Sequence, residues 1–295
     1  MNIEYSICCS FIFLNLYICN HVKISSAFTK GLFIHSRALM IIKGILPIII
    51  TLMASFCMSQ LEIMAQTEIP ANDTTPKARE LTRRDFILHT YNPNTEIISM
   101  FYKDASNKLL RTLGSLKQFV ESSKKELIFA MNGGMYHPDF APVGLFIADH
   151  TMHKPVNLNS GSGNFFIQPN GVFYVDANEK PGICLARDIH KVQKIKHATQ
   201  SGPMLVINRR INPYFSDTSN YFNIRNGVGI TKHGKLIFAM SRKPVTLYEF
   251  AHYFKQQRCV NALYFDGSIS KTYAPRSRWT QLNGNFGVMI GVLKR

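Results

Sequence analysis

The sequence predicts a single domain of the α+β class, with a mixed, mostly antiparallel sheet and a few flanking helices. Short runs rich in Val, Ile, Phe and Tyr recur along the chain, separated by Gly, Asn and Pro turn signals. Strand-like runs outnumber helix-like segments by about three to one. The helix-like segments are scattered and do not alternate regularly with strands, which favours α+β over a doubly wound α/β fold.

The first 66 residues form a leader that is separate from the fold. Residues 40–43 supply a short positive head, and residues 44–61 form an uncharged apolar run, which together are typical of a signal peptide. Residues 1–39 would then be an upstream extension, and cleavage is expected after Ala65, with Ser55 as the alternative position. The apolar run is also long enough for an uncleaved membrane anchor. We therefore expect an exported protein, periplasmic or extracellular, either released or tethered.

Residues 67–84 are a polar linker without hydrophobic periodicity, and residues 85–295 hold the folded domain. The chain carries 34 Lys and Arg against 18 Asp and Glu, a net charge of +16. Such an excess suits acidic partners, above all phosphate-containing glycans. Nucleic acid is not the expected partner, because no helix-turn-helix, zinc-finger or RNP pattern occurs. Cys184 and Cys259 lie in apolar runs and are expected to be buried thiols.

Two helices are predicted from capping-box spacings. The first begins at Ser115, with Gln118 three residues later, and the second begins at Thr246, with Glu249 in the same position. A short helix is also expected within residues 188–197. Residues 86–91 and 97–102 are expected to be strands, joined through Asn92-Pro93-Asn94 either as a hairpin or by a short connection, and residues 164–168 are expected to form a strand.

Four Gly-rich polar segments adjoin apolar strand-like runs, and we call them the four polar segments. They are residues 132–136, 199–203, 223–227 and 266–270. Asp266 lies at the end of an apolar run, where a buried strand would deliver its carboxylate, and Gly267 permits a sharp turn. Arg225 is a forked cation suited to phosphate oxygens. A donor-rich pocket with one cation and one carboxylate suits an anionic, hydroxylated substrate.

The sequence motifs of several other enzyme classes are missing from the chain. The chain contains no G-x-S-x-G elbow, no H-E-x-x-H, no Walker loop and no G-x-G-x-x-G after a strand. Asp266 with backbone carbonyls could hold a cation, but no ligand cluster requires one. The sequence therefore predicts neither a cofactor nor a metal, and it leaves the oligomeric state undetermined.

The four polar segments, taken in order, resemble the phosphodiester glycosidase domain family. The resemblance rests on Asn132-Gly-Gly-Met-Tyr, Gln200-Ser-Gly-Pro-Met, Arg225-Asn-Gly-Val-Gly-Ile and Val260-Asn-Ala-Leu-Tyr-Phe-Asp-Gly-Ser, and it extends from about residue 85 to the C-terminus. It implies hydrolysis of a glycosyl–phosphate diester that releases a sugar and leaves a phosphomonoester. Such a sugar-1-phosphodiester or phosphorylated glycan would be the partner, in envelope or exopolysaccharide metabolism.

The resemblance also implies a set of site residues. The catalytic candidates are Asp266, Arg225 and Asn132, and the substrate-binding candidates are Gly133, Gly134, Gln200, Ser201, Gly202, Gly267, Ser268 and Ser270. Asp266 would serve either as the base for water or as the nucleophile. Ser268 and Ile269 stand where a lysosomal member of the family has two glycines, so the sugar cannot be transferred from that member. The alternative is a non-catalytic module that binds anionic glycans.

Overall fold

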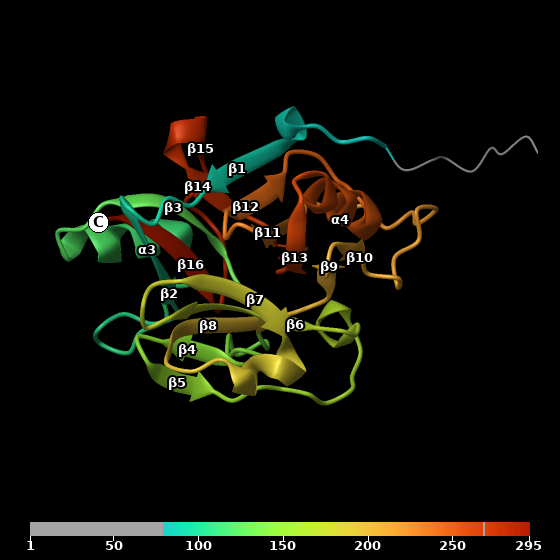
Figure 1. The fold of residues 1–295 in the computed structure, drawn as a ribbon. Coiled ribbons are helices and arrows are strands. Elements are labelled where there is room, and N and C mark those ends of the chain that lie inside the picture. The colour runs from blue at the N-terminus through green and yellow to red at the C-terminus, as the bar shows by residue number, and fades with distance from the viewer. Residues whose placement is uncertain (1–78, 268) are drawn as a thin grey trace, which may run out of the picture. The chain divides into compact units, whose positions relative to one another are not determined.

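The computed structural model describes residues 79–267 and 269–295, in which strands dominate (Figure 1). The predicted leader or anchor at residues 1–66, most of the predicted linker and Ser268 lie outside the described residues. Within the described part of the chain, no helix is both long and apolar enough to cross a membrane.

The strands form three sheets, and every pairing between them is antiparallel. The first sheet has the order β1-β12-β11-β13-β9-β10, with β1 (Phe86–Thr90), β9 (Met204–Ile207), β10 (Arg210–Ile211), β11 (Asn226–Thr231), β12 (Leu236–Ser241) and β13 (Cys259–Tyr264). The second has the order β15-β14-β3-β16-β2, with β2 (Glu96–Phe101), β3 (Leu127–Asn132), β14 (Thr272–Ala274), β15 (Trp279–Thr280) and β16 (Met289–Lys294). The third has the order β5-β4-β8-β6-β7, with β4 (Phe146–Ala148), β5 (Thr151–Lys154), β6 (Gly171–Asp176), β7 (Pro181–Leu185) and β8 (Ile195–Ser201).

The helical segments are few and short. They are α3 (Leu113–Ser122), α4 (Leu247–Gln256) and the 3-10 turns η1 (Arg83–Asp85), η2 (Asn164–Phe166), η3 (Ala186–Lys191) and η4 (Pro275–Ser277). The predicted α+β class with mostly antiparallel strands is confirmed. The strands are divided among three sheets rather than joined in one.

A shared core joins the three sheets. Phe238 of the first sheet, Phe129 of the second and Phe173 of the third are all fully buried. The ring centroid of Phe238 lies 5.4 Å from that of Phe129 and 5.7 Å from that of Phe173. Each such side chain contributes about 1.5–3 kcal/mol when fully buried. The core therefore holds together the strand ends that carry the four polar segments.

The capping box predicted for α4 is confirmed. The Thr246 hydroxyl accepts a hydrogen bond from the Glu249 amide at 3.1 Å, and the Glu249 carboxylate accepts one from the Thr246 amide at 2.9 Å. Phe250, Tyr253 and Phe254 are buried against the first sheet, as their helical spacing predicts. The other prediction, a cap at Ser115, is wrong.

The helix α3 begins at Leu113, because Thr112 is its cap and accepts the amide of Ser115 at 2.9 Å. Ser115 thus lies inside the first turn. Thr112 is itself an efficient cap residue, so the chain offered two hydroxyl candidates three positions apart.

The sequence left two alternatives open for the first two strands, and it misassigned two other segments. The runs at 86–91 and 97–102 contain β1 and β2 as predicted, and a short connection joins them rather than a hairpin, because β1 pairs with β12 and β2 pairs with β16. Residues 164–166 form the 3-10 turn η2, and η3 ends at Lys191 before β8 begins at Ile195. Pairing with strands elsewhere in the chain decides where β1, β2 and β8 lie, and local propensity does not record such pairing.

The predicted thiol state of the two described cysteines is confirmed, since neither forms a disulfide. Cys259 is buried and Cys184 is half-buried. Burial raises the pKa of Cys259 to about 12 and that of Cys184 to about 11. Both thiols are therefore protonated and unreactive at neutral pH.

We expect acid to destabilise the fold through His197. This β8 side chain is 4% exposed, and its Nδ1 accepts a hydrogen bond from the Asp149 amide at 3.2 Å. Burial lowers its pKa from 6.5 to about 4. The unfolded chain therefore binds a proton at a pH where the folded chain does not. The stability that the neutral, buried His197 contributes is fully present above pH 6.5. This contribution is lost as the pH falls toward 4, which lowers the free energy of unfolding by about 3 kcal/mol in total.

Urea unfolding of the full chain across this pH range measures the effect, and His197→Asn is the matched control. The Asn side-chain oxygen replaces the Nδ1 acceptor and does not titrate, so the variant should lose less stability on acidification. An equal loss of unfolding free energy in both proteins would contradict the assignment to His197.

Candidate functional site

Two buried asparagines join the ends of β3, β11 and β13. Asn226, the first residue of β11, is fully buried. Its Nδ2 donates to the backbone oxygen of Asn132 at 2.9 Å and to the Asn132 Oδ1 at 3.0 Å. Its Oδ1 accepts from the Asp266 amide at 3.3 Å and from the Ser270 hydroxyl at 3.1 Å. Asn226 is therefore the hub that brings three of the four polar segments together.

The backbone of Asp266 is held from both sides. Its carbonyl accepts from the Nδ2 of Asn132 at 3.3 Å and from the Ser270 hydroxyl at 2.9 Å, while its amide is bound to Asn226. Asn132 also accepts the Lys271 amide on its Oδ1 at 3.0 Å. The half-buried Asp266 side chain thus starts from a fixed backbone, which pre-organises its carboxylate.

The negative charge of Asp266 acts on two neighbouring tyrosines. Burial, and secondarily Asp266, raises the pKa of Tyr136, whose hydroxyl donates to the backbone oxygen of Asn285. Burial also raises the pKa of Tyr264, with Asp266 adding to that rise and Arg225 opposing it. Both phenols therefore stay protonated beside the carboxylate at neutral pH.

The glycines and Ser201 allow the segments to pack closely. The Ser201 hydroxyl donates to the Phe265 carbonyl at 3.1 Å, and the Gly134 amide donates to the Thr199 hydroxyl at 3.3 Å. A Cβ on Gly134 would lie 2.3 Å from the Gln200 carbonyl oxygen, so only glycine fits there. Gly133 donates its amide to the Val288 carbonyl at 2.8 Å. These contacts tie the ends of β3 and β8 to the strand that carries Asp266.

The Gln200 side chain points to a different part of the chain. Its Oε1 accepts the amides of Leu145 and Asn157 at 3.0 and 2.8 Å, and its Nε2 donates to the Asn157 carbonyl at 2.6 Å. Gln200 is 1% exposed. It therefore fastens the loop around Asn157 onto β8. Gly202 packs against the Phe165 carbonyl and precedes Pro203.

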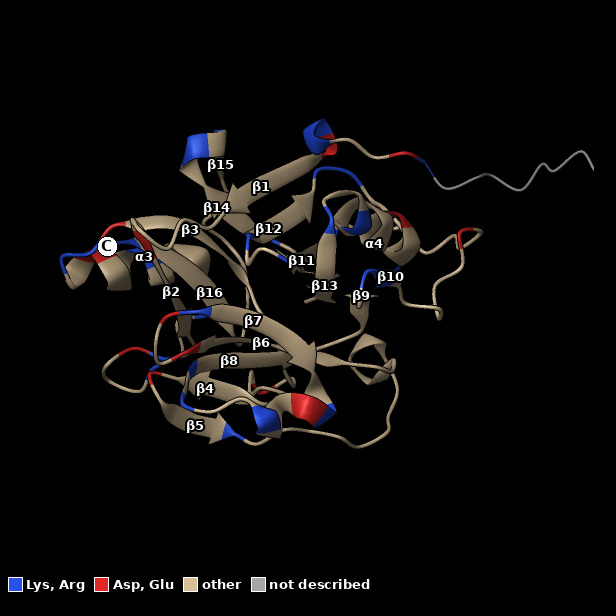
Figure 2. Ribbon diagram, viewed as in Figure 1, with Lys and Arg blue, Asp and Glu red and all other residues tan. Residues whose placement is uncertain are grey.

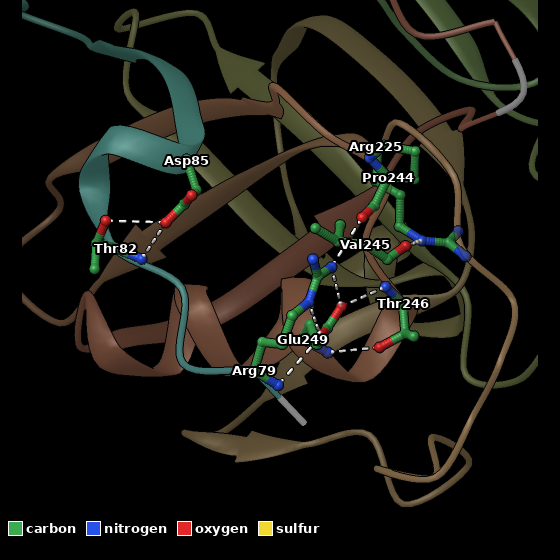
Figure 3. A network of polar contacts seen from close by, with 8 residues as sticks. All are labelled: Arg79, Thr82, Asp85, Arg225, Pro244, Val245, Thr246 and Glu249. Carbon is green, nitrogen blue, oxygen red and sulfur yellow. Dashed lines mark hydrogen bonds and ion pairs between the residues drawn. The ribbon is translucent and has the colours of Figure 1, made fainter. Parts of the chain in front are cut away.

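Arg225 is buried and holds the start of β11. Its Nε donates to the Val245 carbonyl at 2.8 Å (Figure 3). Its Nη2 donates to the Tyr221 carbonyl at 2.7 Å. Its Nη1 donates to the Tyr264 hydroxyl at 3.2 Å. Burial lowers the pKa of Arg225, yet a guanidinium stays charged at neutral pH.

The Tyr264 hydroxyl links Arg225 to the residue after Asp266, because it also accepts the amide of Gly267. The strand register agrees with this closeness. Gly227 pairs with Tyr264, so the same register extended by two residues sets Arg225 across from Asp266. The structure thus brings the predicted cation and carboxylate to adjacent strand ends.

A hollow of about 370 Å³ adjoins Arg225 and carries aromatic and polar side chains. It is lined by Asn164, Ile167, Tyr214, Phe215, Ser216, Ser219, Tyr221, Asn223, Arg225, Leu247 and Tyr248. None of these residues is acidic, and Asp266 is not one of them. Tyr214 and Tyr221 are 66% and 83% exposed, so they present aromatic faces to a ligand.

Glu249 is committed to the cap of α4. It accepts hydrogen bonds from the Arg79 Nε at 2.9 Å and from the Thr246 amide (Figure 3). Arg79 also donates to the Pro244 carbonyl at 2.9 Å, beside the Val245 carbonyl that holds Arg225. Glu249 is 3% exposed. Its role is therefore to brace the N-terminus of α4 next to Arg225.

Gly267→Ala is expected to disturb the site directly. An added Cβ would lie 1.8 Å from the Tyr264 hydroxyl oxygen, and the buried Tyr264 ring has no room to retreat. Overpacking of this kind costs about 1–3 kcal/mol, measurable by urea unfolding. The double variant Gly267→Ala/Tyr264→Phe removes the clashing oxygen, so its loss should fall short of the sum of the single losses. Additive losses would contradict this account.

The sequence reasoning did not select Asn226, Tyr264, Tyr136 or Thr199 as site residues. Asn226 and Tyr136 lie in the polar segments at 223–227 and 132–136, and Thr199 begins the segment at 199–203. The signal available in the sequence was an Asn directly after Arg225, at the start of a strand-like apolar run. A buried amide needs hydrogen-bond partners, so such an Asn is a candidate for joining neighbouring segments. Within residues 79–267 and 269–295, no group of three His, Cys, Asp or Glu side chains could hold a metal ion.

Known proteins share this pattern. A family model for phosphodiester glycosidases matches residues 125–289. The uncharacterized protein YigE of Escherichia coli is 42% identical over 186 residues, which cover 63% of this chain and 72% of that protein. The range matched by the family model contains all four polar segments.

Solved structures show weaker likenesses. The catalytic domain of zebrafish N-acetylglucosamine-1-phosphodiester alpha-N-acetylglucosaminidase, auto-inhibited by its pro-peptide, has a TM-score of 0.49 at 14% identity, over 74% of this chain and 87% of that one. A hypothetical protein from Synechocystis has a TM-score of 0.46 at 16% identity, over 71% of this chain and 59% of that one. On the family match and the identity to YigE, the chain belongs to the phosphodiester glycosidase family.

Proposed function

We propose that this protein hydrolyses glycosyl–phosphate diesters outside the cytoplasm, releasing the sugar and leaving a phosphomonoester. One observation carries the proposal. The buried pair Asn132 and Asn226 fixes the backbone of Asp266 at a strand end adjacent to the buried cation Arg225. Family membership supports the reaction class. The leader pattern supports the location.

In this reaction water adds to the anomeric carbon while the bond from that carbon to the phosphate oxygen breaks. The phosphate leaves with the bonding electron pair, and the proton lost by water goes first to Asp266. If Asp266 instead attacks the sugar, a glycosyl ester forms and water then cleaves it. The leaving phosphomonoester has a second pKa near 6, so strong protonation by an acid is unnecessary. That agrees with a hollow lined by no acidic residue.

The hollow beside Arg225 has the size and chemistry for part of such a substrate. Its volume of about 370 Å³ falls in the range of small-molecule sites. Three of the five N–H groups of Arg225 donate within the described residues, which leaves two for phosphate oxygens. Tyr214, Tyr221 and Tyr248 offer rings against which sugar faces can pack.

The test uses the purified full chain with a panel of sugar-1-phosphodiesters, including UDP-sugars and GlcNAc-1-phospho-6-mannose. Release of a free sugar together with a phosphomonoester is the expected result. Proton NMR of the first product formed then separates the two roles of Asp266. Retention of the anomeric configuration indicates a nucleophile, and inversion indicates a base.

Failure of every diester to release sugar, alongside saturable binding of an anionic glycan, would overturn the proposal in favour of a binding module. Binding at the Arg225 hollow would then be visible as protection of Tyr214 and Tyr221 from iodination. Such protection without turnover would assign the hollow a recognition role only.

A further inference from the structure

We propose that a second, strongly basic hollow binds a ligand carrying clustered phosphate groups, apart from the site of Asp266. This hollow measures about 640 Å³ and lies at the other end of β11 and β13. It is lined by Arg209, Thr231, Lys232, His233, Lys235, Lys255, Gln257, Arg258 and Cys259. Six of these nine side chains are basic and none is acidic.

Distance separates the two sites. Thr231 ends β11, which begins at Asn226, and Cys259 begins β13, which ends at Tyr264. Each strand has six residues, so its ends are about 17 Å apart at the usual rise of 3.3 Å per residue. The first sheet therefore carries the Asp266 network at one end of these strands and the basic hollow at the other.

Separate turns bring the cations together. Lys232 and Lys235 belong to the β11–β12 turn, and Arg258 precedes β13. The Arg209 amide donates to the Val260 carbonyl at 2.9 Å, which holds the β9–β10 turn against the start of β13. In Figure 2, blue segments are visible beside α4 and β13. The arrangement is thus set by the sheet and does not depend on one flexible loop.

Within the described residues, the charges of these cations are not neutralised by ion pairs with acidic side chains. None of the ion pairs formed among residues 79–267 and 269–295 includes a side chain of the basic hollow. Lys255 does complement the negative end of α4, since it lies in its last turn. Lys232, Lys235 and Arg209 have no helix end to complement. Their mutual repulsion is relieved most directly by a bound anion.

The ligand class follows from the number and spread of the charges. A single phosphate contacts two or three cations, whereas here five Lys and Arg side chains and one His surround a hollow of about 640 Å³. Two or more phosphates held a few ångströms apart fit that arrangement better than one. Both an inorganic oligophosphate and a phosphorylated glycan offer such groups, and the experiment separates the two.

Isothermal titration calorimetry of the full chain with tripolyphosphate, at low and at physiological salt, is the first measurement. We expect saturable binding that weakens with salt, and much weaker binding of monophosphate. The double variant Lys232→Gln/Lys235→Gln should lose about tenfold in affinity. Lys108→Gln/Lys125→Gln makes the same change of charge at exposed positions outside the hollow and should leave the affinity within about twofold.

Further experiments distinguish the two types of ligand and show where the ligand binds. Tighter binding of a phosphorylated dextran than of tripolyphosphate, with no binding of plain dextran, would point to a glycan ligand, and the reverse order to an oligophosphate. Asp266→Asn should bind as tightly as the unmodified protein, because its carboxylate lies outside the basic hollow. Equal losses in the two double variants would overturn the proposal. So would preferential binding of an oligonucleotide with the same number of phosphates.

Discussion

Replacing Asp266 by Asn is expected to lower the rate of sugar release by about a thousandfold or more, with the fold unchanged. The amide can neither accept a proton from water nor form a glycosyl ester. The backbone amide and carbonyl of Asp266 keep their hydrogen bonds to Asn226, Asn132 and Ser270 in this variant, and Asn has nearly the same shape as Asp. Sugar release from a cleaved diester, measured with the thermal unfolding midpoint of each protein, gives both quantities.

Asp217→Asn is the matched control, because it makes the same chemical change on the exposed loop beside the Arg225 hollow. It should leave the rate within about twofold. Near-normal turnover by Asp266→Asn would remove that carboxylate from the mechanism. A slow Asp266→Asn protein with a much lower unfolding midpoint would instead show that the side chain serves the fold.

Asn226→Ala should reduce the free energy of unfolding by about 3 kcal/mol, a large effect for a single substitution, because the side chain is fully buried and hydrogen-bonded. The change removes four hydrogen bonds at once and leaves the Asn132 carbonyl, the Asp266 amide and the Ser270 hydroxyl with fewer partners. Urea unfolding of the full chain measures the loss. Turnover should fall as well, since the Asp266 amide then loses its hydrogen bond to Asn226, one of three that hold the Asp266 backbone.

A second asparagine provides the comparison. Asn261 is half-buried and makes two such bonds, donating to the Ile183 carbonyl at 2.9 Å and accepting the Asn208 amide at 3.1 Å. Asn261→Ala should therefore cost about 1 kcal/mol and leave turnover intact. Equal costs at the two positions would contradict the central role given to Asn226.

Sequence reasoning found the polar segments, three of which the structure joins through Asn226, but it did not find which side chains contact one another. The four polar segments were visible because Gly and polar residues interrupt apolar runs, and a strand end is where a chain must turn. Which side chain would turn toward which neighbour depends on pairing across the sheets. Gln200 and Ser201 are adjacent in sequence, yet one fastens the loop at Asn157 and the other supports Phe265. Alternation along a strand sends them to opposite faces.

Local sequence patterns could not predict the division into three sheets, for a similar reason. An apolar strand such as β3 looks the same whether its neighbours come from nearby or from the far end of the chain. Its partners are β14 and β16, more than 130 residues away. Helix α4 was predictable because its cap and its apolar face are both written in ten consecutive residues.

The strand order of the second sheet has a consequence for how the chain acquires its structure. The last strand, β16, lies between β2 and β3 and pairs with both. Likewise β1 pairs with β12. Such a topology has a high contact order, so the entropy of closing long loops is lost before the pairing is gained, and folding should be slow. Until the final residues have been synthesised, β2 and β3 remain unjoined and expose edges open to aggregation.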